Sequence, residues 1–240
     1  FLFSDTKLFK PSKKGIVMKK NYEIAIPVFA DKFSQVSRQS AEAVDKGADI
    51  LEFRLDRIKD LNVHQLWELA NNFRKVKKIY TNRHKDEAGN PEFGYQYDEN
   101  ERLGILRGIA VTHHPDYIDI EHKHTKRGFR PFQKIGKTKI IVSYHDFQKT
   151  PDYDGLRRIY DEIAGRADCD IVKIATMVNE EKDNENIFRL VQHAHAGGGS
   201  KPIVAIGMGE LGAVTRYKGP ELGSLWTFGA LCEKRKSALG

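Results

Sequence analysis

Short apolar runs recur along this chain, and segments with helical hydrophobic spacing separate most of them. The helical segments span residues 37–45, 63–76, 98–111, 153–166 and 180–196. Alternation of the two patterns is typical of parallel β-α units, in which strands covered on both faces are continuously apolar. The sequence therefore predicts eight parallel strands, at residues 23–28, 49–56, 78–82, 117–121, 139–144, 170–175, 202–206 and 224–231.

Eight such strands over residues 21–240 predict one α/β domain, a (β/α)₈ barrel of the TIM type. An open doubly wound sheet is the alternative. No glycine-rich phosphate fingerprint follows the first strand, which disfavours the dinucleotide-binding version of that sheet. Residues 1–20 carry no clear pattern, and we interpret them as an irregular N-terminal extension.

Composition limits the class of protein further. Hydrophobic residues make up 40% of the chain, and two cysteines in 240 residues indicate no disulfide framework. No stretch approaches the roughly 20 apolar residues of a membrane span, and no secretory signal pattern opens the chain. The net charge of +7 admits a polyanionic partner, but no nucleic-acid-binding motif accompanies the basic clusters. We expect a soluble cytoplasmic protein that binds neither membrane nor nucleic acid.

Polar residues gather where the predicted strands end. In a barrel, catalytic groups lie at the carboxyl ends of the strands and in the loops that follow. The residues at such positions are Glu52, Arg54, Asp56, Arg83, Asp86, Glu87, Asp119, Glu121, His122, His124, His145, Asp146, Lys173, Met208, Glu210 and Arg216. Their convergence predicts an active site at that end of the barrel.

Two of these residues suit covalent catalysis. Lys173 stands in the apolar strand 170–175, where burial disfavours the charged ammonium. A neutral amine attacks a ketone and forms a Schiff base. His145 ends the neighbouring strand and suits a general base beside it. The structural alternatives are a lysine paired with a buried carboxylate and a histidine that satisfies only local hydrogen bonds.

The segment from Asp119 to His124 suggests a metal site as a second interpretation, since a His-x-His pair on a strand projects both imidazoles one way. A basic, loop-like stretch follows, and no comparable ligand cluster stands out elsewhere in the sequence. We therefore expect no metal. His193 and His195 lie two apart on a predicted helix and face different ways, as surface residues do.

Six segments occur in the order and spacing of one known family. They are EFRLD at 52–56, YTNR at 80–83, YIDIE at 117–121, SYHDF at 143–147, DIVKIA at 170–175, and GM at 207–208 with TR at 215–216. On these segments the chain resembles type I 3-dehydroquinate dehydratase over roughly residues 22–240. That family is a (β/α)₈ barrel that converts 3-dehydroquinate into 3-dehydroshikimate in the shikimate pathway, without metal or diffusible cofactor.

The resemblance implies a role for each site residue. Lys173 would form an imine with the substrate ketone. His145 would transfer the proton during syn elimination of water, and Glu87 would orient it. Arg216 would bind the carboxylate of this small anionic substrate. The other substrate-binding positions implied are Glu52, Arg54, Arg83, Met208 and Ser237.

The resemblance also implies a homodimer. The family often caps the bottom of the barrel with an N-terminal hairpin, but residues 1–20 show no match to it, so they are expected to be an irregular extension or such a cap. The family's last helix, and a substrate-contacting glutamine in its closing loop, have no counterpart up to Gly240. Three alternatives stay open. They are another Schiff-base barrel lyase or aldolase, a metal-dependent barrel hydrolase, and a truncated barrel without activity.

Overall fold

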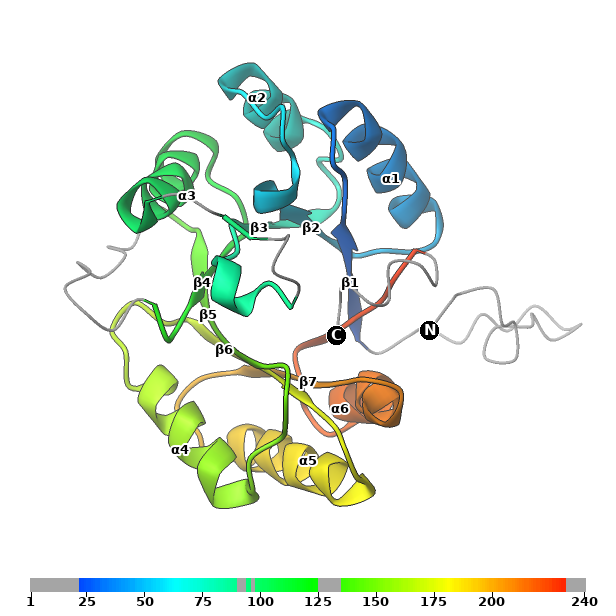
Figure 1. Cartoon of the computed structure of the whole chain (residues 1–240), viewed down its shortest axis with the longest axis vertical. Coiled ribbons are helices and arrows are strands. Elements are labelled where there is room, and N and C mark those ends of the chain that lie inside the picture. The colour runs from blue at the N-terminus through cyan, green and yellow to red at the C-terminus, as the bar shows by residue number, and fades with distance from the viewer. Residues whose placement is uncertain (1–21, 90–93, 96–97, 125–134, 232–240) are drawn as a thin grey trace, which may run out of the picture.

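The computed structural model describes residues 22–89, 94–95, 98–124 and 135–231. Eight strands form a ring with helices arranged around it (Figure 1). The strands are β1 (Glu23–Val28), β2 (Ile50–Arg54), β3 (Lys77–Thr81), β4 (Tyr117–Glu121), β5 (Lys139–Asp146), β6 (Ile171–Met177), β7 (Ile203–Met208) and β8 (Trp226–Phe228). All eight predicted strands are present, with ends that differ by a few residues.

The strand order is β7-β6-β5-β4-β3-β2-β1-β8, and every ladder is parallel. β1 pairs with β2 on one side and with β8 on the other, which brings the last strand back to the first. A backbone hydrogen bond of 2.9 Å from Leu225 to the carbonyl of Ile203 joins the start of β8 to β7. The predicted TIM-type barrel is therefore confirmed, and the open doubly wound sheet is wrong.

The helices follow the strands as a parallel barrel requires. They are α1 (Phe33–Asp45), α2 (Val63–Asn71), α3 (Glu99–His113), α4 (Tyr153–Ala164), α5 (Glu181–His195) and α6 (Thr215–Glu221). Short 3₁₀ turns are η1 (Leu55–Arg57), η2 (Lys85–Glu87) and η3 (Leu211–Val214). The predicted helix over 63–76 ends early, at Asn71, because Asn72 is extended and Phe73 has a positive φ of 54°.

Side-chain caps set where several helices begin. Asn62 and Gln65 form a reciprocal capping box at the start of α2. The Asp98 carboxylate accepts from two backbone amides at the start of α3, and Asp152 does so from Gly155 at α4. These oxygens satisfy amides that have no partner inside the helix.

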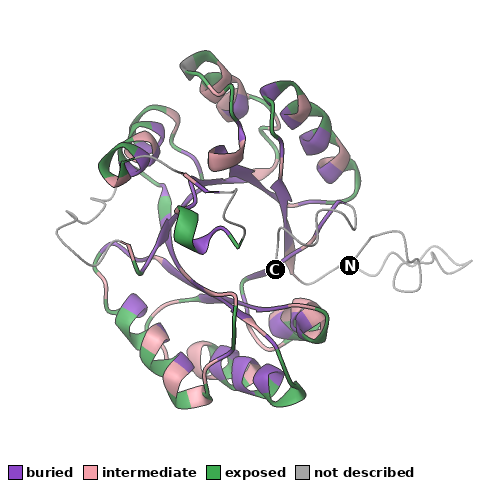
Figure 2. Cartoon of the chain, in the orientation of Figure 1, coloured by how far each residue is buried: buried purple, intermediate pink, exposed green. Residues whose placement is uncertain are grey.

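Burial follows the barrel layers. The strands are buried along nearly their whole length, whereas each outer helix has one buried and one exposed face (Figure 2). Inside the barrel, apolar side chains at the strand starts fill one end, with Trp226 only 1% exposed. The opposite end holds the polar groups.

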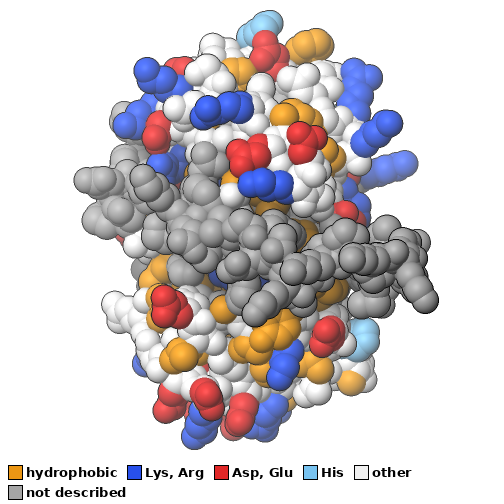
Figure 3. Space-filling model, turned by 90° about the vertical axis from the view of Figure 1, so that its right-hand side faces the viewer, with side chains coloured by type: hydrophobic (Ala, Val, Ile, Leu, Met, Phe, Trp, Pro, Cys, Tyr) orange, Lys and Arg blue, Asp and Glu red, His pale blue; other side chains and the backbone are white. Residues whose placement is uncertain are grey.

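The surface gives two further observations. On the face shown in Figure 3, Lys and Arg side chains are interspersed with Asp and Glu over the described residues. Mixed signs of this kind favour solubility over attraction of a polyanion to that face. No helix of the described residues is both long enough and apolar enough to cross a lipid bilayer.

Candidate active site

Polar side chains form a layer inside the barrel, directly above the apolar one. Side chains two positions apart on a strand point to the same side. On β2 to β6, an inward apolar residue near the strand start is therefore followed by an inward polar one. The pairs are Ile50 and Glu52, Ile79 and Thr81, Tyr117 and Asp119, Ile141 and Ser143, and Ile171 and Lys173. The change from apolar to polar along these five strands gives the site its floor.

A cleft of about 520 Å³ opens above this layer. Its walls come from β2, β5, β6, β7, β8, η2 and α6, and from residues that follow β1 and β3. The residues that line it are Phe29, Glu52, Arg54, Arg83, Glu87, Ala88, His145, Phe147, Lys173, Ala175, Ile206, Met208, Arg216 and Phe228. Eight of the nine site residues predicted from sequence lie here together, and the ninth, Ser237, lies outside the described residues.

The Lys173 amine lies at the base of the cleft. Its Nζ donates to Oδ2 of Asp119 at 2.8 Å and lies 3.6 Å from Oε1 of Glu52. It also lies 4.7 Å from the ring centre of Phe228. The amine thus has a carboxylate partner, as in the structural alternative of the sequence analysis. It also faces the cleft, as the catalytic interpretation requires.

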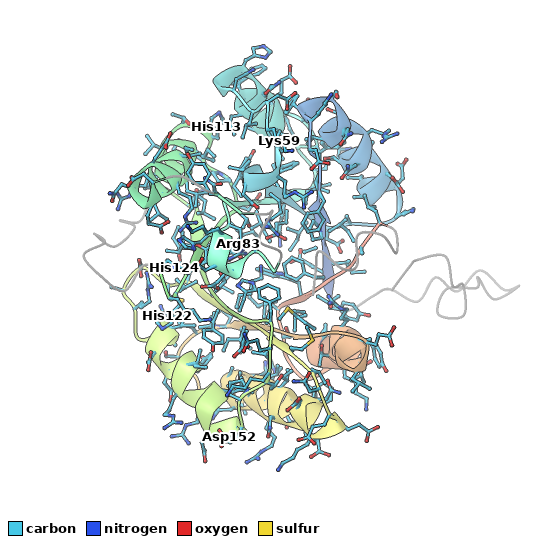
Figure 4. The ribbon with its side chains drawn as sticks, viewed as in Figure 1. Lys59, Arg83, His113, His122, His124 and Asp152 are labelled. Atoms are coloured by element: carbon cyan, nitrogen blue, oxygen red, sulfur yellow. The ribbon has the colours of Figure 1, made fainter. Side chains whose placement is uncertain are left out.

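Arg83 ties the polar layer together. Its guanidinium donates to both oxygens of Asp119 at 3.1 Å, and to Glu121 at 3.0 Å and Ser143 at 2.8 Å. Burial opposes its charge, but Asp119 and Glu121 raise the pKa of Arg83 above its ordinary value. Arg83 lies toward the middle of the ring in Figure 4. Its hydrogen bonds hold two neighbouring carboxylates in place below the substrate space.

His145 and Glu87 form a hydrogen-bonded pair at the mouth of the cleft. Oε2 of Glu87 accepts from the backbone N–H of His145 at 3.1 Å and lies 2.9 Å from its Nδ1. A carboxylate at Nδ1 favours the Nδ1–H tautomer, which leaves the Nε2 lone pair available as a base. Burial, with Arg83 and Lys173 nearby, lowers the pKa of His145 well below 6.5, so the ring is neutral near pH 7.

Glu87 reaches His145 because η2 lies across the open end of the barrel (Figure 1). Burial, and then repulsion from Glu121, raise the pKa of Glu87 to about 8.

Two arginines complete the cleft. Arg54 makes two bonds to Asp56, at 2.9 and 2.8 Å, which fix its guanidinium beside the cleft. Arg216 donates to the carbonyl of Phe228 at 3.2 Å, and no carboxylate among the described residues pairs with it. Burial lowers the pKa of Arg216 to about 10, which leaves it cationic at neutral pH. A buried cation without an anion favours binding of an anionic ligand.

His122 and His124, the histidines of the alternative metal interpretation, point to different neighbours. β4 ends at Glu121, so His122 and His124 lie after the strand and not on it. His122 faces Glu162 on α4 at 3.3 Å, whereas His124 faces Glu87 at 3.5 Å (Figure 4). The expectation that both imidazoles project one way is wrong.

His84, Asp86 and His124 do offer ligand atoms within 4.8 Å of one another. The rings of His84 and His124 are stacked, with centroids 3.6 Å apart and planes 14° apart. An ion in the plane of one ring would then lie far from the plane of the other, although imidazole nitrogens bind metals in the ring plane. These three side chains do not form a ready metal site.

Sequence reasoning missed the role of Asp119. It entered only among the polar residues at the strand ends, within YIDIE and in the metal alternative, yet it holds both Lys173 and Arg83. The signal was present, because YIDIE places Asp119 at an inward position of a buried strand, two strands from the strand of Lys173 in the barrel. Ser143 and Phe228, which contact Arg83 and Lys173, were missed as well.

Comparison with known proteins identifies relatives of this chain. The model of the type I 3-dehydroquinase family matches residues 24–240. A 3-dehydroquinate dehydratase of Methanococcus maripaludis is 35% identical over 221 residues, which cover 90% of this chain and 93% of that protein. A chloroplastic bifunctional 3-dehydroquinate dehydratase/shikimate dehydrogenase of Arabidopsis thaliana is 34% identical, over 90% of this chain and 34% of that protein.

Solved structures agree with the sequence relatives. The crystal structure of 3-dehydroquinate dehydratase from Geobacillus kaustophilus superposes with a TM-score of 0.80 and 25% identity. The alignment covers 89% of this chain and 84% of the other. The fold comparison and the sequence comparison therefore lead to the same family.

Proposed function

The chain belongs to the type I 3-dehydroquinase family and is a lyase that removes water from 3-dehydroquinate, and we propose that it does so through a Schiff base on Lys173. The reaction yields 3-dehydroshikimate and is a step of the shikimate pathway. The residue roles below follow from where the side chains lie around the cleft.

Lys173 supplies the nucleophile. Once the ammonium has given up a proton, the amine attacks the C3 ketone. The resulting carbinolamine takes the proton back and loses water to give a protonated imine. The iminium withdraws electrons from C2 and acidifies the proton there. Asp119, 2.8 Å from Nζ, supports this cation electrostatically through the reaction.

His145 moves the proton. Its Nε2 takes the proton from C2, and the electron pair flows into the iminium to give an enamine. The enamine then expels the C1 hydroxyl, which leaves as water with the proton that His145 carried. Glu87 keeps Nδ1 protonated, so Nε2 faces the substrate throughout. Water finally hydrolyses the imine and frees the amine of Lys173.

Arg216 holds the substrate carboxylate. It is the cleft cation that lacks a carboxylate partner among the described residues, so an incoming anion completes its coordination. Glu52, Arg54 and Arg83 present polar atoms to the ring hydroxyls, and Met208 packs against the ring. Ser237 is proposed on the resemblance alone.

One observation carries the proposal. A lysine on β6 and a histidine on β5, the latter backed by Glu87, line the same cleft as Arg216. The test is steady-state dehydration of 3-dehydroquinate, followed by the absorbance of the conjugated enone product. Turnover by the wild-type chain supports the assignment. No turnover by folded protein rejects it.

Family membership supports three further proposals. Residues 21–240 form one catalytic domain, and residues 1–20, expected to be an irregular extension or a barrel-bottom cap, lie outside the described residues. The protein is a homodimer, which sedimentation equilibrium tests, and it binds a small anionic substrate rather than nucleic acid or membrane. The two cysteines in 240 residues fit a reducing cytoplasm, which cell fractionation tests.

A further inference from the structure

The outer oxygen of Glu87 is the starting observation. Oε2 receives both hydrogen bonds from His145, whereas Oε1 is buried and has no hydrogen-bond partner among the described residues. A buried carboxylate oxygen without a donor costs free energy. A donor aimed at Oε1 is therefore expected.

His124 presents the matching atom. Its Nε2 lies 3.5 Å from Oε1 of Glu87 and is itself buried without a hydrogen-bond partner among the described residues. Two orphaned polar atoms thus face each other at slightly more than bonding distance. Hydrogen bonds in catalytic sites are often long without substrate and shorten when it binds.

The ring of His124 is held from its other side. His84 stacks on it, with ring centroids 3.6 Å apart. His84 is itself anchored, because its backbone N–H donates to Oε1 of Glu121 at 3.1 Å and its Nδ1 accepts from the backbone N–H of Asp86 at 3.2 Å. The position of His124 beside Glu87 is therefore built into the site rather than left to a free surface side chain.

We propose that His124 is a positioning residue for the dehydration: it donates its Nε2 proton to the outer oxygen of Glu87 and so keeps that carboxylate ionised and turned toward His145. This inference rests on the proposed function, in which His145 is the base. His124 acts only through Glu87 and touches no reacting atom.

Charged neighbours act on both members of this pair. Those that face them are Arg83, His84, Asp86, Glu99, Asp119, Glu121, Lys123 and His145. Burial, followed by Glu121, raises the pKa of Glu87 to about 8, and burial with His84 lowers the pKa of His124 below 6.5. The first shift favours a protonated Glu87, so the carboxylate needs a donor at Oε1 to stay ionised near neutral pH. The second shift leaves His124 with a neutral ring, which can donate from Nε2.

Loss of the donor has a defined consequence. Without the Nε2 proton, Glu87 binds a proton more readily, and a protonated Glu87 no longer supports the Nδ1–H of His145. The limb of the kcat/KM profile that falls toward acid pH should then move to higher pH. A hydrogen bond to a charged acceptor corresponds to a shift of about one pH unit or more.

The experiment compares two substitutions at one position. His124→Phe keeps the stacking surface and removes the donor, so its acid limb should lie about one pH unit above that of the wild type. His124→Gln keeps an amide N–H near the position of Nε2, so its limb should remain close to the wild type. His113→Phe, at the end of α3 on the outer ring (Figure 4), is the control and should cause no shift.

Two results would overturn the proposal. One is an unshifted acid limb in His124→Phe, even if turnover or melting temperature falls. The other is an equal shift in both His124 variants, since a donor would then be irrelevant.

A measurement on the wild-type protein keeps the proposal testable if a variant does not fold. The ¹⁵N shifts of His124 at pH 7 should report the Nε2–H tautomer, and the Nδ1–H tautomer would contradict the assignment. Because this readout needs no activity, it separates failure of the role of His124 from failure of the proposed function.

Discussion

Oδ2 of Asp119 lies 2.8 Å from Nζ of Lys173, while the same carboxylate accepts two hydrogen bonds of 3.1 Å from Arg83. One buried anion thus stands between two buried cations. Burial alone would raise the pKa of Asp119, but Arg83 and Lys173 hold it well below its usual range. This arrangement fixes the amine at the floor of the cleft and supplies a counter-charge for an iminium.

Asp119→Asn should lower the free energy of unfolding by about 3–5 kcal/mol, because it leaves buried cations without their anion. Urea denaturation measures the change. Asp161→Asn is the control, since Asp161 forms an exposed pair with Arg157 at 3.6 Å on α4. That variant should lose less than about 1 kcal/mol. Equal, small losses in both would mean that the Asp119 pairs contribute little.

The same pair predicts a pH dependence of stability. Asp119 has a depressed pKa in the folded state, so its contribution is present above the unfolded value near 3.8 and is lost as the pH falls below it. The difference in free energy of unfolding between wild type and Asp119→Asn should therefore be constant near neutral pH and shrink in acid. A difference that does not change with pH would contradict this account.

His145→Ala should slow turnover by about 10²–10⁴-fold, the usual contribution of a positioned acid–base group. Imine formation between Lys173 and the product should persist, because the amine is unchanged. Borohydride reduction with the product, read by mass, checks this second expectation. Loss of both turnover and imine would mean that His145 has a different role.

Arg216→Met should raise KM by about 10-fold or more, since a charge-assisted bond to the substrate carboxylate is lost. The melting temperature should not fall, because no described carboxylate depends on this guanidinium. Arg189→Met is the control, as Arg189 is exposed on α5 and packs on Tyr153. An unchanged KM in Arg216→Met would remove the proposed carboxylate contact.

Prolonged dialysis against a chelator should leave turnover unchanged. The proposed steps use only side chains, and the only group with metal-ligand spacing among the described residues, His84, Asp86 and His124, has stacked rings that do not share a coordination point. Activity that disappears with chelator and returns with zinc would favour the metal-dependent hydrolase alternative.

Much of the fold was predictable because the spacing of hydrophobic residues along the sequence reflects which faces of a strand or helix are buried. Strands enclosed on both faces are largely apolar, which made all eight visible, and the charged residues that interrupt those runs pointed to Lys173 and Glu52. The early end of α2 was not predictable in this way, since the positive φ of Phe73 depends on tertiary packing rather than on hydrophobic spacing.

The site was predictable only in part. Strand positions identified which residues share an end of the barrel, but not which carboxylate pairs with which cation. Glu87 lies on η2, outside any strand, so its contact with His145 rested on resemblance before the structure. His124 and Glu87 lie outside the strands and α-helices, where hydrophobic periodicity gives no information about side-chain direction. Their contact could therefore be found only in the structure.

The central claim is that Lys173 forms an imine with the substrate. The most direct test incubates the protein with 3-dehydroquinate and borohydride, then measures intact mass and maps the modified peptide. The account predicts one stable adduct on Lys173 in the wild type and in Lys139→Ala, whose lysine is exposed at the opposite end of the barrel. Lys173→Ala should remain folded by circular dichroism, form no adduct and show no turnover. Turnover by Lys173→Ala, or an adduct on another lysine, would contradict it.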